Sequence, residues 1–191
     1  IELVKHNLRT MQKKCPNLDA REGNAMDLSK FEDDSFDIVL LFGPMYHLIS
    51  HEHKLKALNE AKRVVRETGF ILISYCLNEY AIIEHGIKEG FLKQAVEKGE
   101  VDENFHVISK EDDLYSYVRI EDINKLKDEA GLTRYKIIGQ DGAAEYLKRE
   151  INHMDEESFA CFMAYHLANC ERYELLGASR HALDILRKYV H

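Results

Sequence analysis

The residues best suited to chemistry follow an apolar run in the first quarter of the chain. The run at residues 36–42 ends at Gly43-Pro44, and Tyr46 and His47 come directly after it. A continuous run rich in Val, Ile and Leu and bounded by turn residues predicts a strand buried on both faces of a parallel sheet. Because ligands bind beyond the carboxyl ends of such strands, Tyr46 and His47 are predicted to be catalytic, orienting a substrate or relieving it of a proton. The alternative is an ordinary strand-to-helix connection, with Tyr46 packed and His47 at the start of the next helix.

Glu2 is a second candidate, because it follows what reads as the last residue of a strand. At the end of the second strand of a nucleotide-binding unit, a carboxylate can accept hydrogen bonds from both hydroxyls of a ribose. The alternative is a carboxylate that is favoured only by the dipole at a helix start.

The elements that would position these groups alternate between strand and helix. The patterns in the first half of the chain predict a helix at 4–15 ended by Pro16, a short strand at 18–22, the strand at 36–42, and a strand at 70–76. Between the strands at 36–42 and 70–76, Ser50 is predicted to cap the start of a helix, and Gly69 is predicted to follow the end of that helix. Two strands joined by a helix form a right-handed crossover unit.

The second half of the chain is less regular at first. The patterns predict helical pieces at 80–97, strand-like fragments at 105–108 and 115–118, a helix at 120–130 capped by Gly131, a strand at 132–138, helices at 141–152 and 155–169, and a last strand at 181–188. Leu183 and Ile185 are expected to point inward from that last strand. An α/β domain follows from this order of elements.

Composition narrows the class of protein. The 191 residues are 45% hydrophobic, enough for one domain with its own core. A formal net charge of −8 argues against general binding to nucleic acid. No apolar segment approaches the ~20 residues that span a bilayer, and no signal peptide is visible, so a cytoplasmic protein without membrane contact is expected. Four cysteines without a Cys-x-x-Cys pair predict neither a zinc site nor a disulfide framework, and we expect no metal.

One segment carries a specific resemblance. Residues 22–28, Glu-Gly-Asn-Ala-Met-Asp-Leu, are followed by Phe31 and by Asp33-Asp34-Ser35-Phe36-Asp37. This pattern resembles the class I S-adenosylmethionine-dependent methyltransferases, whose third strand ends in Gly-Asp-Ala and whose fourth strand opens with Phe-Asp-x-Val. The resemblance spans residues 2–188. It implies a Rossmann-like, mostly parallel sheet with flanking helices and an antiparallel last strand, and it implies S-adenosyl-L-methionine as the cofactor.

The resemblance also implies which residues hold the cofactor. Asn24 and Ala25 would contact the adenine edge, with Met26 packed on the ring. Glu2 matches the ribose-binding acid and Leu3 the apolar residue beside the adenine, while Phe42 and Gly43 match the strand end that passes the methionine moiety. Asn24 stands where the family usually has Asp, but an amide carbonyl can still accept a hydrogen bond.

The acceptor side departs from the amine-methylating members of the family. Gly43-Pro44-Met45-Tyr46 stands where those enzymes carry Asp/Asn-Pro-Pro-Tyr, so the side chain that would hold an amine of a base or of a protein amide is missing. A small-molecule acceptor is therefore expected. The resemblance implies that insertions at 79–118 and 141–180 build the acceptor side. Four residues are predicted to bind substrate: Tyr75, His166, Arg172 and His181. His166 also reads as a core histidine on the apolar stripe of its helix.

The first strand of the family and its glycine-rich turn have no counterpart before Ile1. We therefore expect residues 1–191 to form a single methyltransferase-like domain that is incomplete at its N-terminus and, on its own, a poor binder of cofactor. The strand ends at Glu2, Asn24 and Gly43 are predicted to converge on one cleft. Two other functions stay open: a non-catalytic or degenerate binding module of this fold, and a nicotinamide-dependent oxidoreductase, which also uses an acid on the ribose.

Overall fold

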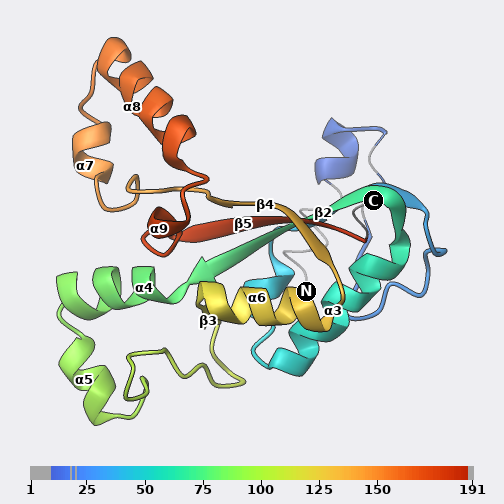
Figure 1. Ribbon diagram of the computed structural model, residues 1–191, viewed down its shortest axis with the longest axis horizontal. Helices are drawn as coiled ribbons and strands as arrows, with labels where there is room; N and C mark the ends of the chain where they lie inside the picture. Colours follow the sequence, from blue (N-terminus) through green and yellow to red (C-terminus); the bar gives the residue numbers. More distant parts are fainter. Residues whose placement is uncertain (1–9, 18, 20, 189–191) are drawn as a thin grey trace.

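A five-stranded mixed sheet lies at the centre of the computed structural model, which describes residues 10–17, 19 and 21–188 (Figure 1). Its strands are β1 (Phe36–Leu41), β2 (Val65–Leu77), β3 (Tyr117–Val118), β4 (Thr133–Gly139) and β5 (His181–Arg187). The order is β1-β2-β5-β4, and β3 pairs with the carboxyl end of β2. β1 and β2 are parallel, whereas β5 is antiparallel to both β2 and β4. The predicted α/β class with an antiparallel last strand is confirmed.

The helices connect these strands and fix the ends of the site. They are α2 (Pro44–His47), α3 (His51–Val64), α4 (Asn78–Ala81), the π-helix η1 (Ile82–Lys88), α5 (Leu92–Glu97), α6 (Ile120–Glu129), α7 (Lys148–Ile151), α8 (Glu156–Asn169) and α9 (Tyr173–Leu176). Residues 10–14 are also helical. The predicted cap of α3 is confirmed, because Ser50 Oγ accepts the His53 N–H at 3.1 Å. Within the described residues, no helix has the length and apolar composition needed to cross a bilayer.

The core lies between the sheet and helices α3 and α6, which Figure 1 shows together below the strands. Its fully buried side chains include Ala57, Leu58 and Ala61 of α3, Ile123 and Leu126 of α6, Ile71 and Ile73 of β2, and Ala182 and Leu186 of β5. Burial of apolar area, worth about 25 cal/mol per Å², therefore holds the crossover unit β1-α3-β2 together. The same packing sets where the start of α3 lies relative to the carboxyl end of β1.

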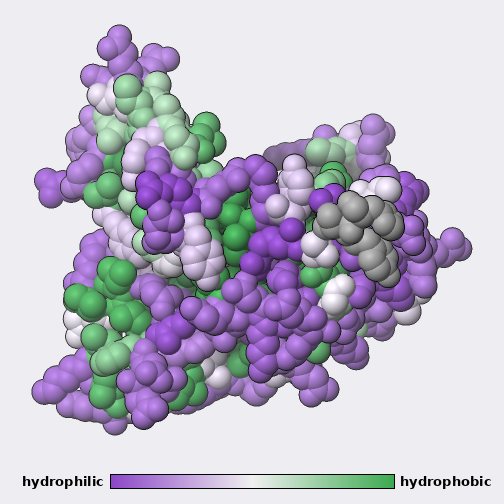
Figure 2. Space-filling view, in the orientation of Figure 1, coloured by the Kyte–Doolittle hydropathy of each residue, from purple (hydrophilic) through white to green (hydrophobic). Residues whose placement is uncertain are grey.

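The opposite face of the sheet is more open than the sequence predicts. Ile38 and Leu40 are 58% and 55% exposed, and the register sets them beside Phe70 and Leu72 of β2. The prediction that the 36–42 run is buried on both faces is therefore wrong for the described residues. α7 and α8 stand on this side of the sheet in Figure 1. Figure 2 shows apolar side chains over α8, where Phe159, Met163 and Leu167 are exposed.

The last strand turns a different face to the helices than expected. Ala182, Asp184 and Leu186 are buried, while Leu183 and Ile185 are only partly covered. Successive side chains of a strand point to opposite faces, so residues 182, 184 and 186 share one face and residues 183 and 185 the other. The local pattern does not say which of the two faces meets the helices. The buried Asp184 is accommodated by Arg134, whose Nε and Nη2 donate to the two carboxylate oxygens at 2.7 and 2.9 Å.

Gly69 is not a helix cap, contrary to the prediction. α3 ends at Val64, and Val65 is already extended, with φ −75° and ψ 141°. Gly69 lies inside β2, where the β1–β2 register shifts between Phe36 and Ile38. A Cβ at Gly69 would lie 2.6 Å from the Asp37 carbonyl oxygen. Glycine is needed there because the two strands approach too closely for any side chain.

Two further expectations from local pattern differ from the structure. Helix at 141–152 is restricted to α7, and residues 141–147 form turns in which Gly142 has φ +53°. For the strand predicted at 18–22, the described residues 19, 21 and 22 are outside any strand, and only an isolated bridge joins Asn24 to Asp27. The expected helix at 4–15 is helical over residues 10–14, and its first part lies outside the described residues.

Candidate functional site

Four aromatic and imidazole rings gather beyond the carboxyl ends of β1 and β2. α2 starts directly after β1 with Pro44 in its first turn, a position where the ring and its fixed φ suit a helix start. This places Tyr46 and His47, whose ring centroids are 4.8 Å apart. The Tyr46 ring lies 6.0 Å from Tyr115 and 6.3 Å from His181, and the His47 ring lies 5.4 Å from Tyr115. The structure thus brings predicted residues Tyr46, His47 and His181 together.

Two hydrogen bonds join α2 to the segment that carries Tyr115, one between main-chain groups and one from the His47 side chain. The Ser116 N–H donates to the Tyr46 carbonyl at 2.8 Å. His47 Nδ1 lies 2.8 Å from the Leu114 carbonyl oxygen. A carbonyl oxygen only accepts, so Nδ1 carries the proton, and in the neutral ring Nε2 keeps its lone pair. Tyr115 is absent from the predicted site, because no local pattern reveals contacts made across about seventy residues.

His181 forms a close pair with Asp141. Its Nδ1 lies 2.8 Å from Asp141 Oδ2, and the same oxygen accepts the His181 backbone N–H at 2.7 Å. The hydrogen bond to Asp141, followed by that to Cys76, raises the pKa of His181 to about 9 although burial opposes the charge. The imidazole is therefore protonated at neutral pH, and its ring is suited to donating a hydrogen bond rather than removing a proton. The sequence does not mark Asp141 as a site residue, because its local pattern predicts only a helix at 141–152.

The predicted adenine segment forms a turn beside an open hollow. Asn24 Oδ1 accepts the Met26 N–H at 3.0 Å, which fixes the turn, and Ala25 and Met26 pack against the core. The hollow, about 860 Å³ in volume, is lined by residues that include Glu22, Asn24, Ala25 and Phe31. Ligand pockets are typically about 300–1,000 Å³. The space and the exposed amide of Asn24 therefore fit a planar heterocycle such as adenine.

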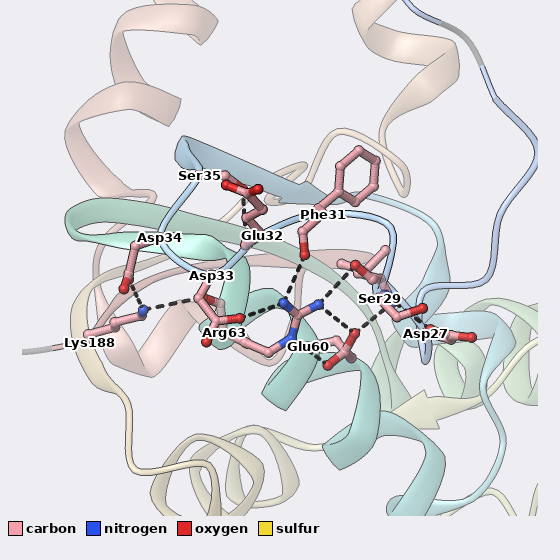
Figure 3. Close-up of polar contacts among 11 residues, drawn as sticks. Asp27, Ser29, Phe31, Glu32, Asp33, Asp34, Ser35, Glu60, Arg63 and Lys188 are labelled. Carbon is pink, nitrogen blue, oxygen red and sulfur yellow. Dashed lines mark hydrogen bonds and ion pairs between the residues drawn. The ribbon is translucent and has the colours of Figure 1, made fainter.

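Arg63 holds the chain that follows this turn against α3 (Figure 3). Each nitrogen of its guanidinium donates: Nε and Nη2 to Glu60 at 3.0 and 3.1 Å, Nη2 also to the Leu28 carbonyl at 2.9 Å, and Nη1 to the Phe31 carbonyl at 2.9 Å and to Asp33 at 2.7 Å. The hydrogen bond to Glu60, then that to Asp33, raises the pKa of Arg63 further above its usual range.

Two further contacts hold the loop at residues 28–34, one from Glu60 and one from Lys188. Glu60 Oε2 accepts the Leu28 N–H at 2.6 Å, and Lys188 Nζ donates to Asp34 at 2.5 Å. Arg63 and Glu60 were not among the predicted site residues. Their spacing of three on one helix face was the available signal, but it does not say that the pair would bind a loop.

The remaining predicted site residues are scattered. Tyr75 is 1% exposed in the core, where burial raises the pKa of its phenol, and its predicted contact with substrate stays a prediction. His166 lines a separate cavity of about 80 Å³ with Phe162 and Cys170. Arg172 is exposed and pairs with Glu174. Phe42 is exposed at the end of β1 and Gly43 is the N-cap of α2. Glu2 and Leu3 lie outside the described residues, so the convergence of Glu2, Asn24 and Gly43 stays a prediction.

Comparison with known proteins bears on this arrangement. Residues 1–73 match the family model described as a methyltransferase domain. The chain has the class I methyltransferase fold. This match and the structural neighbours imply S-adenosylmethionine as the cofactor. No curated protein matches the chain.

Solved structures share the methyltransferase fold at low sequence identity. A possible histamine N-methyltransferase from Thermotoga maritima is 14% identical, with a TM-score of 0.51, 96% of this chain covered and 69% of that one. A putative sarcosine dimethylglycine methyltransferase from Galdieria sulphuraria is 16% identical, with a TM-score of 0.52 and coverages of 97% and 65%. The [4+2]-cyclase SpnF is 13% identical, with a TM-score of 0.56 and coverages of 98% and 64%. The chain thus spans about two thirds of the length of these proteins.

Proposed function

We propose that this chain belongs to an S-adenosylmethionine-dependent methyltransferase that acts on a small-molecule acceptor. The observation that carries the proposal is the gathering of Tyr46, His47, Tyr115 and His181 beyond the carboxyl ends of the parallel strands β1 and β2. Ligands bind at this edge of α/β sheets. The fold and the match of residues 1–73 to a methyltransferase domain supply the reaction class.

The cofactor, when bound, supplies an electrophilic methyl group on a sulfonium. The side chains of this protein would then have to align the acceptor and exclude water. The phenol rings of Tyr46 and Tyr115 provide apolar walls. His47 Nε2, with Nδ1 committed to the Leu114 carbonyl, is placed to accept a proton from the acceptor. The protonated His181, held by Asp141, brings a positive charge to the same cluster of rings.

The net charge of the chain and the glycine that opens the Gly43-Pro44-Met45-Tyr46 motif both favour a small acceptor. The net charge of −8 opposes nucleic acid, and Gly43 offers no side chain to hold a base or protein amide. Two neighbours carry names of enzymes acting on small amines, histamine and sarcosine or dimethylglycine. The cyclase SpnF shows that the fold alone does not set the reaction, so the acceptor must be found by experiment.

The proposal is tested on the natural protein, including any residues that its gene encodes before Ile1. Incubation with methyl-labelled S-adenosylmethionine and a fractionated small-molecule extract should transfer label to a compound of low molecular mass. Lys56→Met, on the exposed side of α3, serves as the control, and His47→Gln should lower transfer at least tenfold. Binding of S-adenosylhomocysteine without transfer to any fraction would favour a non-catalytic module, and binding of NADH in its place would favour an oxidoreductase.

A further inference from the structure

Lys54 is a buried lysine whose nitrogen has only neutral hydrogen-bond partners. It lies in the second turn of α3 and is 3% exposed. Its Nζ donates to the Ile49 carbonyl and to Ser116 Oγ, both at 2.8 Å. Among the described residues no carboxylate forms an ion pair with it. The charge of Asp122 acts on Lys54 without an ion pair between them, and the Asp122 carboxylate lies 3.4 Å from His106 Nε2.

Both partners of Lys54 belong to segments that build the ring cluster. Ile49 lies in the turn between α2 and α3, two residues after His47. Ser116 follows Tyr115 directly, and its N–H donates to the Tyr46 carbonyl. One ammonium group therefore joins the turn after α2 to the segment that lies over the Tyr46 and His47 rings.

A lysine at this core position costs folding free energy. Burying an ammonium group without a counter-charge costs more than burying an apolar side chain of the same length. Methionine would fill the same volume without that cost, but it has no N–H groups. What lysine adds is an ammonium group with three N–H donors at the end of a long stem, and two of them reach two chain segments at once.

We propose that Lys54 is a positioning residue that fixes residues 114–116 so that Tyr115 lies against Tyr46 and His47. It touches neither acceptor nor cofactor and acts through Ser116 and Ile49. The catalytic consequence rests on the proposed function. The ordering of the segment does not, and it can be measured without an acceptor.

Hydrogen exchange tests the ordering, with Lys54→Met and Ser116→Ala as variants. Lys56→Met is the matched control, because it is the same change two residues away at an exposed position of the same helix. In Lys54→Met the amides of residues 114–116 should exchange at least tenfold faster than in the wild type. The amides of β2 and of the second half of α3 should keep their protection, and Lys56→Met should resemble the wild type throughout.

Ser116→Ala should reproduce most of the change in Lys54→Met, and the double variant should add little to either. Unchanged exchange at residues 114–116 in Lys54→Met would overturn the proposal. So would an equal rise over the whole chain, which would mark Lys54 as a general stabiliser.

Once an acceptor is known, Lys54→Met should raise KM for that acceptor at least tenfold. It should leave the affinity for S-adenosylhomocysteine within twofold of the wild type. An unchanged KM, together with faster exchange at residues 114–116, would refute the catalytic consequence alone. If no acceptor is methylated, the proposed function fails and the exchange experiment still decides the role of Lys54.

Discussion

The pair His181–Asp141 makes the protein's stability depend on pH in a way that Asp141→Asn should abolish. The pKa of His181 is raised from 6.5 to about 9, first by the hydrogen bond to Asp141 and then by that to Cys76. Asp141 is half-buried, which opposes its ionisation, yet the hydrogen bond and charge of His181 keep the pKa of its carboxyl below the usual value. These two shifts describe one interaction and are counted once.

The magnitude and sign follow from linkage. A histidine whose pKa is higher in the folded than in the unfolded state stabilises the folded protein. The full stabilisation is present at pH values below the unfolded-state pKa, near 6.5, and it is lost as pH rises through 9. The difference between 6.5 and about 9 corresponds to about 3 kcal/mol. At pH 6, Asp141→Asn should therefore lower the free energy of unfolding by about 2–3 kcal/mol. At pH 10 the difference should fall to the ~1 kcal/mol of a neutral hydrogen bond.

Urea unfolding of the wild type and of Asp141→Asn, measured at intervals from pH 6 to 10, gives this difference directly. Other titrating groups are common to both proteins and cancel. NMR titration of the His181 ring supplies an independent value, which should drop toward 6.5 in the variant. A difference in stability that stays constant over this pH range, or a His181 that titrates near 6.5 in the wild type, would refute the reasoning.

Three further substitutions test the packing. Burial lowers the pKa of Lys54 from 10.5 to about 8, so its charge costs stability below pH 8 and that cost fades as pH rises to 10.5. The shift corresponds to about 3 kcal/mol, and the two hydrogen bonds lost on substitution offset roughly 1 kcal/mol of it or more. Lys54→Met should therefore be more stable than the wild type to urea at pH 7, by about 1–2 kcal/mol, with no gain near pH 11. Gly69→Ala should lower the unfolding free energy by about 2–3 kcal/mol in the same assay, because its Cβ would meet the Asp37 carbonyl; an unchanged midpoint would contradict the close approach. Asp184→Asn should cost about 3–5 kcal/mol by leaving the Arg134 charge without its buried partner, and a loss under 1 kcal/mol would show that water reaches the pair.

Local patterns predict the parts of the fold that depend on neighbours in sequence. The strand at 70–76, the Ser50 cap and the helix at 120–130 follow from apolar spacing and capping chemistry, and the structure contains all three. The face that β5 turns inward does not follow, because it depends on the distant Arg134 meeting Asp184. Gly69 likewise serves the approach of another strand rather than the end of its own helix.

The candidate site divides along the same line. Tyr46 and His47 can be predicted because they follow a recognisable strand end, and the family resemblance adds His181. Tyr115, Asp141 and Lys54 become visible only when the fold brings distant segments together. Tyr75 is the opposite case. Its position near the end of a strand suggests a site residue, but its side chain points to the face of β2 that packs in the core.

Calorimetric titration of the natural protein with S-adenosylhomocysteine tests the central claim, a cofactor site beside the Asn24–Met26 turn, most directly. We predict saturable binding of one ligand per chain, weakened at least fivefold by Asn24→Ala and unchanged by Lys56→Met. Absence of binding at millimolar ligand, or an affinity that Asn24→Ala leaves untouched, would contradict the account.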